Sequence, residues 1–199
     1  MTQTTDKHAA ELIAAIEALP QIRKTKPIQR NEIFAKKLKF CCVACNFRET
    51  GAEIKLKQTK RKTLNELIEY MDAAKGLLND QIYELSCQMF AANIYSNTPF
   101  KVQYFDYVDE ETVETSKAWN HKVLVYTYFL KFLGNSEFMP TKAKKYFNHQ
   151  FLQRMVDMFN INDSNEREYL KTCLHRVYAK FLGMRAHIRK IITNKVYCL

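Results

Sequence analysis

Cysteine and histidine residues in this sequence could carry chemistry, and their spacing decides which chemistry. Cys173 and His175 could be the thiol and base of a nucleophilic pair, but residues two apart on a helix point to different faces. Cys41, Cys42 and Cys45 lie close enough to share a metal, yet no histidine is near and no second cysteine pair follows at zinc-finger spacing. We therefore expect buried, reduced thiols, with no metal site and no catalytic site.

Acidic residues cluster once, in the stretch from Tyr104 to Ala118. The cluster could bind a hard cation, but it lacks the alternating oxygen ligands and the turn glycine of a calcium loop. A solvated acidic loop, or one that meets a basic partner, is the better interpretation. The acids are Asp106, Asp109, Glu110, Glu111 and Glu114. The chain also has only four glycines and no glycine-rich phosphate loop, so we expect no nucleotide or other cofactor and no enzyme activity.

The segment from Glu166 to Ile192 predicts two helices joined at Gly183. Apolar residues recur at i, i+3, i+4, i+7 and i+11, the spacing of a helix with one buried face. Asp163 and Ser164 can cap its start, and Gly183 can end it. The apolar stripe consists of Leu170, Cys173, Leu174, Val177 and Phe181.

A second set of residues flanks that stripe. His175, Tyr178 and Leu182 follow one another at i, i+3 and i+7, and Arg176 and Arg185 border them with positive charge. An aromatic and aliphatic patch surrounded by cations could bind an apolar, acidic peptide. The alternative is a packed helix pair with a solvated basic edge.

Helical spacing continues through most of the remaining chain, and no alternating strand pattern occurs. Proline and glycine mark the expected helix ends. The expected helices lie near residues 6–19, 27–45, 64–76, 82–94, 119–134 and 140–160. Pairs of such helices at an interval near 40 residues match the roughly 40 to 47 residues of a HEAT repeat. An ordinary helical bundle is the alternative.

We therefore predict an all-α fold, a HEAT-like helical-hairpin solenoid in one domain, residues 1–199. Residues 1–20 would form a leading helix and residues 100–114 an acidic loop between repeats. Hydrophobic residues make up 47% of the sequence, too many for a disordered chain.

The formal net charge is +10, and it is unevenly distributed. Residues 21–62 and 166–199 are basic, whereas residues 104–118 are acidic. This pattern fits acidic protein partners, and it also permits a basic helical-repeat protein that binds nucleic acid. We expect no membrane partner, because no run reaches the roughly 18 apolar residues of a span. The scattered cysteines and the lack of a signal sequence predict the cytoplasm or the nucleus.

The residue string itself resembles the B-prime (B56-type) family of regulatory subunits of protein phosphatase 2A. The most similar block is Lys171–Lys190, and further blocks match in the same order. These further blocks are Glu32–Val43, Lys60–Tyr70, Ala118–Leu133 and Ala143–Tyr146. The resemblance covers about Leu19 to about Tyr197 and implies a HEAT-like array. It also implies a non-catalytic subunit that binds the scaffold and catalytic subunits and steers substrate choice in signalling.

Two sets of candidate site residues follow, one from the resemblance and one from the segregated charge together with the resemblance. One set matches positions that bind a Leu-x-x-Ile-x-Glu motif in partner proteins, and the other would meet basic surface of the phosphatase. The motif set is Thr172, His175, Arg176, Tyr178, Leu182 and Arg185, and the phosphatase set is Asp109, Glu110 and Glu111.

The solenoid of the family continues beyond the position that matches Leu199. We therefore expect apolar surface at the C-terminal end, from Ile188, Ile191, Ile192, Val196 and Tyr197. The second wall of the motif pocket would come from the following repeat. Its absence would weaken motif binding by one to two orders of magnitude or abolish it.

Overall fold

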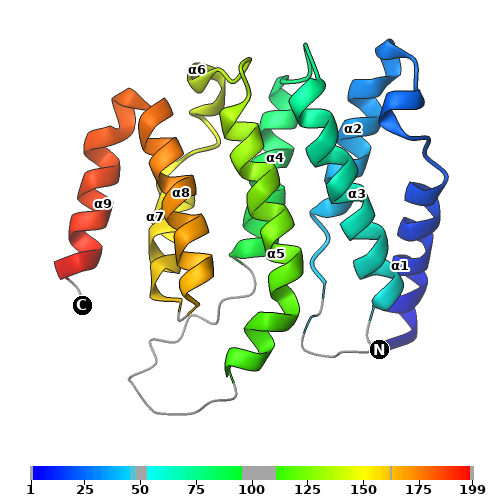
Figure 1. Cartoon of the computed structure of the whole chain (residues 1–199), viewed down its shortest axis with the longest axis horizontal. Coiled ribbons are helices and arrows are strands. Elements are labelled where there is room, and N and C mark those ends of the chain that lie inside the picture. Colours follow the sequence, from blue (N-terminus) through cyan, green and yellow to red (C-terminus); the bar gives the residue numbers. More distant parts are fainter. Residues whose placement is uncertain (1, 46, 48–52, 96–110, 162, 198–199) are drawn as a thin grey trace.

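The computed structural model describes residues 2–45, 47, 53–95, 111–161 and 163–197, and this part of the chain is helical without strands (Figure 1). The helices are α1 (Thr2–Glu17), η1 (Ile22–Lys24), α2 (Pro27–Cys41), α3 (Ile54–Ala73), α4 (Asp80–Ile94), α5 (Glu111–Gly134), α6 (Pro140–Ala143), α7 (His149–Asp157), η2 (Met158–Asn160), α8 (Ser164–Lys180), η3 (Leu182–Met184) and α9 (Arg185–Tyr197). No described helix has the length and apolar character needed to cross a bilayer.

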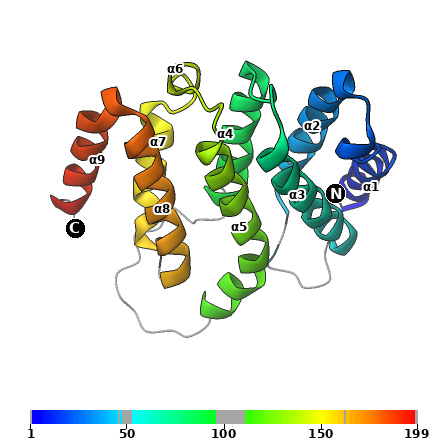
Figure 2. The ribbon, with the colours of Figure 1, turned by 45° about the horizontal axis from the view of Figure 1, so that its top comes forward.

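The helices form two layers in a row, as Figures 1 and 2 show from two directions. Helices α3, α5 and α8 make one layer, and α2, α4 and α7 make the other. Each helix packs against its sequence neighbour in the opposite layer, in the pairs α2 with α3, α4 with α5 and α7 with α8. Helix α1 packs on α2 and α3 at one end, and α9 packs on α7 at the other. This stack of helical hairpins confirms the predicted all-α, HEAT-like class.

Local sequence explains where several helices begin. Pro27 and Pro140 occupy the first positions of α2 and α6, where the missing N–H is not needed. Asn79 and Asn148 cap α4 and α7, each accepting a hydrogen bond from the backbone N–H three residues on. Gly76, in the turn before α4, has a φ of +67°, which favours glycine.

Aromatic rings form the centre of the core and connect successive repeats. The Phe90 ring of α4 stacks on Phe129 of α5, with 4.1 Å between ring centroids. The ring centroids of Phe147 and Phe181 lie 4.7 Å apart, and Phe181 directly follows α8. These four rings are buried, so the core runs from the second hairpin into the third without interruption.

Buried polar side chains also join the helices. Lys122 of α5 forms an ion pair with Glu166 of α8 at 2.8 Å, and Tyr126 donates a hydrogen bond to the same carboxylate at 3.0 Å. Glu166 is fully buried. Lys60 of α3 donates to the Asn93 side chain of α4, and no buried side-chain nitrogen or oxygen in the described residues lacks a hydrogen-bond partner. Burying a polar or charged group costs free energy unless the group is hydrogen-bonded or paired. Because a shift of one helix along another would break these contacts, they define how the helices align.

Two expectations from the sequence need correction. The acidic loop was expected to reach residue 114, but α5 begins at Glu111, so the irregular stretch is shorter at that end. Residues 96–110 lie outside the described part of the chain. Ile188 and Ile191 were expected to be exposed, yet they are only 1% and 2% exposed, because α9 turns them toward the core beside α7. Tyr197 is 85% exposed, as expected.

The Lys122–Glu166 pair predicts a large stability effect. Glu166→Ala would leave the buried Lys122 ammonium without its carboxylate and should lower the free energy of unfolding by about 3 to 5 kcal/mol, measured by urea denaturation. The double variant Lys122→Met with Glu166→Leu should recover most of this loss. Lys171→Ala removes an exposed ion pair with Glu168 and serves as the control, with no measurable change expected. Equal small losses for Glu166→Ala and Lys171→Ala would contradict this assignment.

Candidate functional site

Helix α8 carries most of the predicted site residues, and its first turn is well defined. The Asp163 carboxylate accepts hydrogen bonds from the N–H groups of Asn165 and Glu166, which confirms Asp163 as a cap. Ser164 is the first helical residue. The helix ends at Lys180, before the predicted Gly183, because Phe181 leaves the helical conformation and turns into the core.

The buried face of α8 determines which side chains reach solvent. Leu170, Cys173, Val177 and Phe181 of the predicted stripe are buried, and Leu174 is partly buried. The opposite face is exposed and presents Thr172, His175 and Arg176. The predicted amphipathic pattern is therefore confirmed, and it leaves Thr172, His175 and Arg176 outside the core, whereas Tyr178 packs against it as a partly buried residue.

Tyr178 is the centre of a cationic cluster at the turn between α8 and α9. The Arg185 guanidinium lies over the Tyr178 ring, 5.0 Å from its centroid, and its Nε donates to the Tyr178 carbonyl at 3.0 Å. Arg189 donates a hydrogen bond to the Tyr178 hydroxyl at 2.7 Å. Leu182, in η3, is 66% exposed. The turn thus presents an aliphatic side chain next to an aromatic ring and two arginines.

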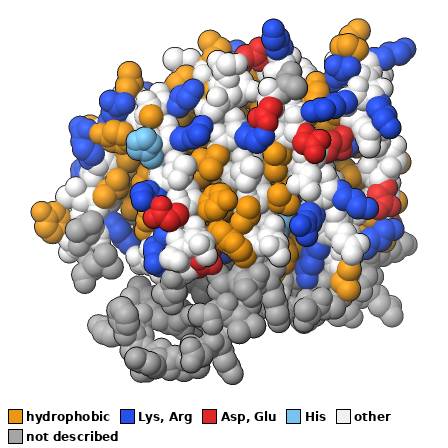
Figure 3. All heavy atoms as spheres, viewed as in Figure 1, with side chains coloured by type: hydrophobic (Ala, Val, Ile, Leu, Met, Phe, Trp, Pro, Cys, Tyr) orange, Lys and Arg blue, Asp and Glu red, His pale blue; other side chains and the backbone are white. Residues whose placement is uncertain are grey.

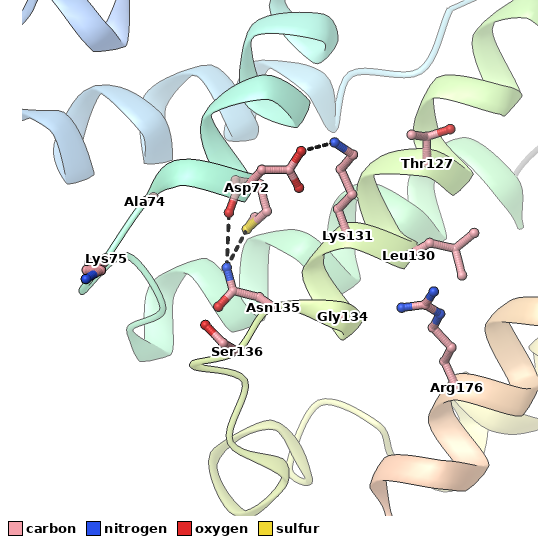
Figure 4. Close-up of a pocket in the computed structure, with 11 residues that line it drawn as sticks. Asp72, Ala74, Lys75, Thr127, Leu130, Lys131, Gly134, Asn135, Ser136 and Arg176 are labelled. Atoms are coloured by element: carbon pink, nitrogen blue, oxygen red, sulfur yellow. Dashed lines mark hydrogen bonds and ion pairs between the residues drawn. The ribbon is translucent and has the colours of Figure 1, made fainter.

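Arg176 lies on the other flank of α8, because two residues on a helix are separated by roughly 200°. Figure 4 shows its guanidinium directed toward α5, in a hollow bordered by Leu130, Gly134 and the end of α3. A Cβ atom at Gly134 would lie 2.6 Å from a guanidinium nitrogen of Arg176, so glycine permits this close approach. Lys131 also borders the hollow and is paired with Asp72.

The six predicted motif residues therefore form a strip across the exposed face of α8 and the following turn. Tyr178, Leu182 and Arg185 lie on the α9 side, and Arg176 lies on the α5 side. Thr172 and His175 lie between these flanks, and the Thr172 hydroxyl donates to the carbonyl of Glu168. Figure 3 shows Lys and Arg side chains beside hydrophobic ones over this end of the array. Sequence reasoning missed Arg189, although its spacing of four from Arg185 on one helix was a usable signal.

The strip is electropositive. Among the described residues, Arg176, Arg185 and Arg189 form no ion pair with a carboxylate. Arg185 and Arg189 instead contact the ring, the carbonyl and the hydroxyl of Tyr178. Arginines in this arrangement can accept a carboxylate or phosphate in a charge-assisted hydrogen bond.

The other predicted groups do not form a reactive centre in the described residues. Cys173 is buried while His175 is exposed, so the two side chains lie on different faces of α8. Burial raises the pKa of the Cys173 thiol to about 12. No three His, Cys, Asp or Glu side chains come together as a metal site in the part of the chain searched. Asp109 and Glu110 lie outside the described residues, and Glu111 begins α5.

Comparison with known proteins identifies the family. Residues 19–199 match the protein phosphatase 2A regulatory B subunit (B56 family). The chain is 40% identical over 183 residues to the serine/threonine-protein phosphatase 2A 56 kDa regulatory subunit alpha isoform of Mus musculus, covering 91% of this chain and 37% of that protein. It is 37% identical over 188 residues to the delta isoform of Oryctolagus cuniculus, covering 92% and 32%. The chain thus spans about a third of the length of these relatives.

The surroundings of Cys173 predict slow thiol chemistry. A pKa of about 12 instead of about 8.5 lowers the thiolate fraction at pH 8 by roughly three orders of magnitude. Alkylation of Cys173 by iodoacetamide, followed by peptide mass spectrometry, should therefore be very slow in the native protein and fast in urea. His175→Ala should leave the native rate unchanged. Rapid native alkylation that His175→Ala abolishes would show that the two residues work as a pair.

Proposed function

We propose a regulatory function from the premise that this chain belongs to the B56 family of protein phosphatase 2A regulatory subunits. The relatives are named as regulatory subunits of a serine/threonine phosphatase. We infer that this chain is likewise non-catalytic, binds the phosphatase complex and brings selected proteins to it. Neither the family description nor these names mention nucleic acid, and we do not propose that alternative. The cytoplasm or nucleus stays a prediction from the sequence.

The single observation that carries the proposal is the cluster around Tyr178. It combines an exposed leucine, an aromatic ring and two arginines without carboxylate partners among the described residues. Apolar and acidic groups within a few residues of one another are the chemistry that such a surface recognises. The Leu-x-x-Ile-x-Glu motif, which the family resemblance implies, has these features.

The geometry suggests how the motif would lie. Leu182 and the Tyr178 ring would contact an aliphatic anchor, because Leu182 is exposed and the Tyr178 ring is partly exposed beside it at the turn. Arg185 uses its Nε for the Tyr178 carbonyl, and its terminal nitrogens have no hydrogen-bond partner among the described residues. These nitrogens would receive the glutamate carboxylate.

Peptide titration tests this site directly. Binding of a fluorescent Leu-x-x-Ile-x-Glu peptide, followed by anisotropy, should weaken about tenfold or more for Arg185→Ala, because a charge-assisted hydrogen bond contributes about 1.5 to 3 kcal/mol. Tyr178→Ala should have a similar effect by removing the ring and the support for both arginines. Lys190→Ala is the matched control, since Lys190 is an exposed cation beside Arg189 on α9.

The outcomes separate specific from general attraction. Equal losses for Arg185→Ala and Lys190→Ala would mean that the peptide responds only to net charge. Replacing the glutamate of the peptide with glutamine should remove most of the Arg185 effect, because the two changes act on one contact.

The acidic set, Asp109, Glu110 and Glu111, is proposed as a contact with basic surface of the phosphatase. Reversing all three to lysine should lower the association rate with purified scaffold and catalytic subunits, with a larger effect at low salt. Reversal of three exposed acids elsewhere, Glu32, Glu69 and Glu84, provides the control. An unchanged association rate for the first variant would remove these acids from the interface.

A further inference from the structure

The turns between successive hairpins lie along one edge of the array. Figures 1 and 2 both place the start of α2, the α3–α4 turn and α6 along the upper side of the molecule. We call this surface the turn edge and define it by residues 22–28, 74–80 and 137–145. The α8–α9 turn lies along the same upper side, but its residues belong to the site described above and are left out of this definition.

Hydrogen bonds tie the three turns of this edge together. Asn31 of α2 donates to the carbonyl of Gly76 at 3.1 Å, and the Gly76 N–H donates to the Glu137 carboxylate at 2.8 Å. The Met139 N–H donates to the Tyr83 hydroxyl of α4 at 2.7 Å. The edge is therefore held in one arrangement, with the side chains that project from it fixed relative to one another.

Two large apolar side chains project from the turn edge into solvent. Ile28, in the first turn of α2, is 95% exposed, and Met139, just before α6, is 48% exposed. Both lie at turns, where neighbouring helices do not enclose them. Single exposed apolar side chains are common on protein surfaces, so Ile28 and Met139 carry weight only together with the charge around them.

The surroundings of these two side chains are cationic. Five exposed lysines on the turn edge form no ion pair within the described residues, namely Lys24, Lys26, Lys75, Lys142 and Lys144. The acids of the edge are already engaged. Asp80 forms an ion pair with Lys145 at 2.9 Å, and Glu137 accepts the Gly76 N–H. The turn edge therefore carries net positive charge around the side chains of Ile28 and Met139.

We propose that the turn edge docks on the surface of a membrane that contains anionic lipid. Ile28 and Met139 would enter the boundary between headgroups and acyl chains, and the lysines would contact lipid phosphates and carboxylates. This is attachment from one side, with no span. From the sequence we expected no membrane partner, because a search for long apolar runs does not detect single apolar residues that two separate turns bring to one edge.

The positive charge of the turn edge would also attract nucleic acid or an acidic protein. The exposed side chains of Ile28 and Met139 favour a membrane over both. A phosphate backbone offers no apolar contact for Ile28. A protein partner would need a separate pocket for each projecting side chain, whereas a lipid surface accepts any projecting apolar group. The proposal does not rest on the regulatory function, and its failure would leave that function untouched.

Co-sedimentation of the full chain with lipid vesicles tests the proposal. At 0.15 M salt, the protein should bind vesicles of phosphatidylcholine and phosphatidylserine in a 3:1 ratio and should bind pure phosphatidylcholine at least tenfold more weakly. Ile28→Ser with Met139→Ser should lower binding about tenfold or more, because each buried CH₂ group contributes about 0.8 kcal/mol. Reversing Lys24, Lys26, Lys142 and Lys144 to glutamate should lower binding more than about a hundredfold.

Matched controls separate the turn edge from overall charge. Ile54→Ser removes a 51% exposed isoleucine at the start of α3, on the opposite edge, and should change nothing. Charge reversal at four other exposed lysines, Lys39, Lys55, Lys62 and Lys171, should lower binding much less than reversal at the edge. Equal effects of the two reversals, or no effect of Ile28→Ser with Met139→Ser, would overturn the proposal. Binding to polyglutamate but not to vesicles would assign the edge to an acidic protein.

Discussion

The position of α8 depends on the buried ion pair between Lys122 and Glu166, which holds only when the two helices are aligned in one way. Glu166 is inaccessible to solvent and meets both the Lys122 ammonium and the Tyr126 hydroxyl of α5. Removing either charge from water costs several kcal/mol, which only close pairing and further hydrogen bonds offset. A shift of α8 along α5 would separate these groups, so one alignment of the two helices is strongly preferred. Because Asp163 also caps the helix at Glu166, the start of α8 and its register are defined by the same few residues.

This alignment determines what the exposed face of α8 can do. With its stripe buried, α8 directs Arg176 toward the hollow beside α5, while the chain after Phe181 brings Arg185 and Arg189 back to Tyr178. The cationic strip is therefore a product of packing rather than of a preformed pocket. It offers positive charge and modest apolar area on a rigid support. Such a surface suits a short peptide with an apolar anchor and an acid better than it suits catalysis.

The sequence predicted the helical class and the amphipathic face of α8, because both depend on local spacing and on capping residues such as Asp163. It also identified Tyr178, Arg185 and Leu182, which the structure brings together at one turn. It did not predict the inward orientation of Ile188 and Ile191, because that depends on the angle at which α9 returns to α7. Arg176 was assigned to the same patch as Tyr178, although a separation of two residues on a helix already places them on different flanks. Only the position of Arg176 in the hollow beside α5 required the structure. Contacts between residues distant in the sequence, such as that between Gly134 and Arg176, leave no local signal.

We propose that the α8–α9 turn is the surface at which this chain recognises an acidic, apolar peptide. Hydrogen–deuterium exchange measured with and without a saturating Leu-x-x-Ile-x-Glu peptide tests it most directly, since a bound ligand suppresses local opening of the segment that it contacts. We predict slower exchange in residues 178–189 and unchanged exchange in α2–α4. Protection confined to the hollow between α3 and α5, or none in residues 178–189 under saturating conditions, would contradict it.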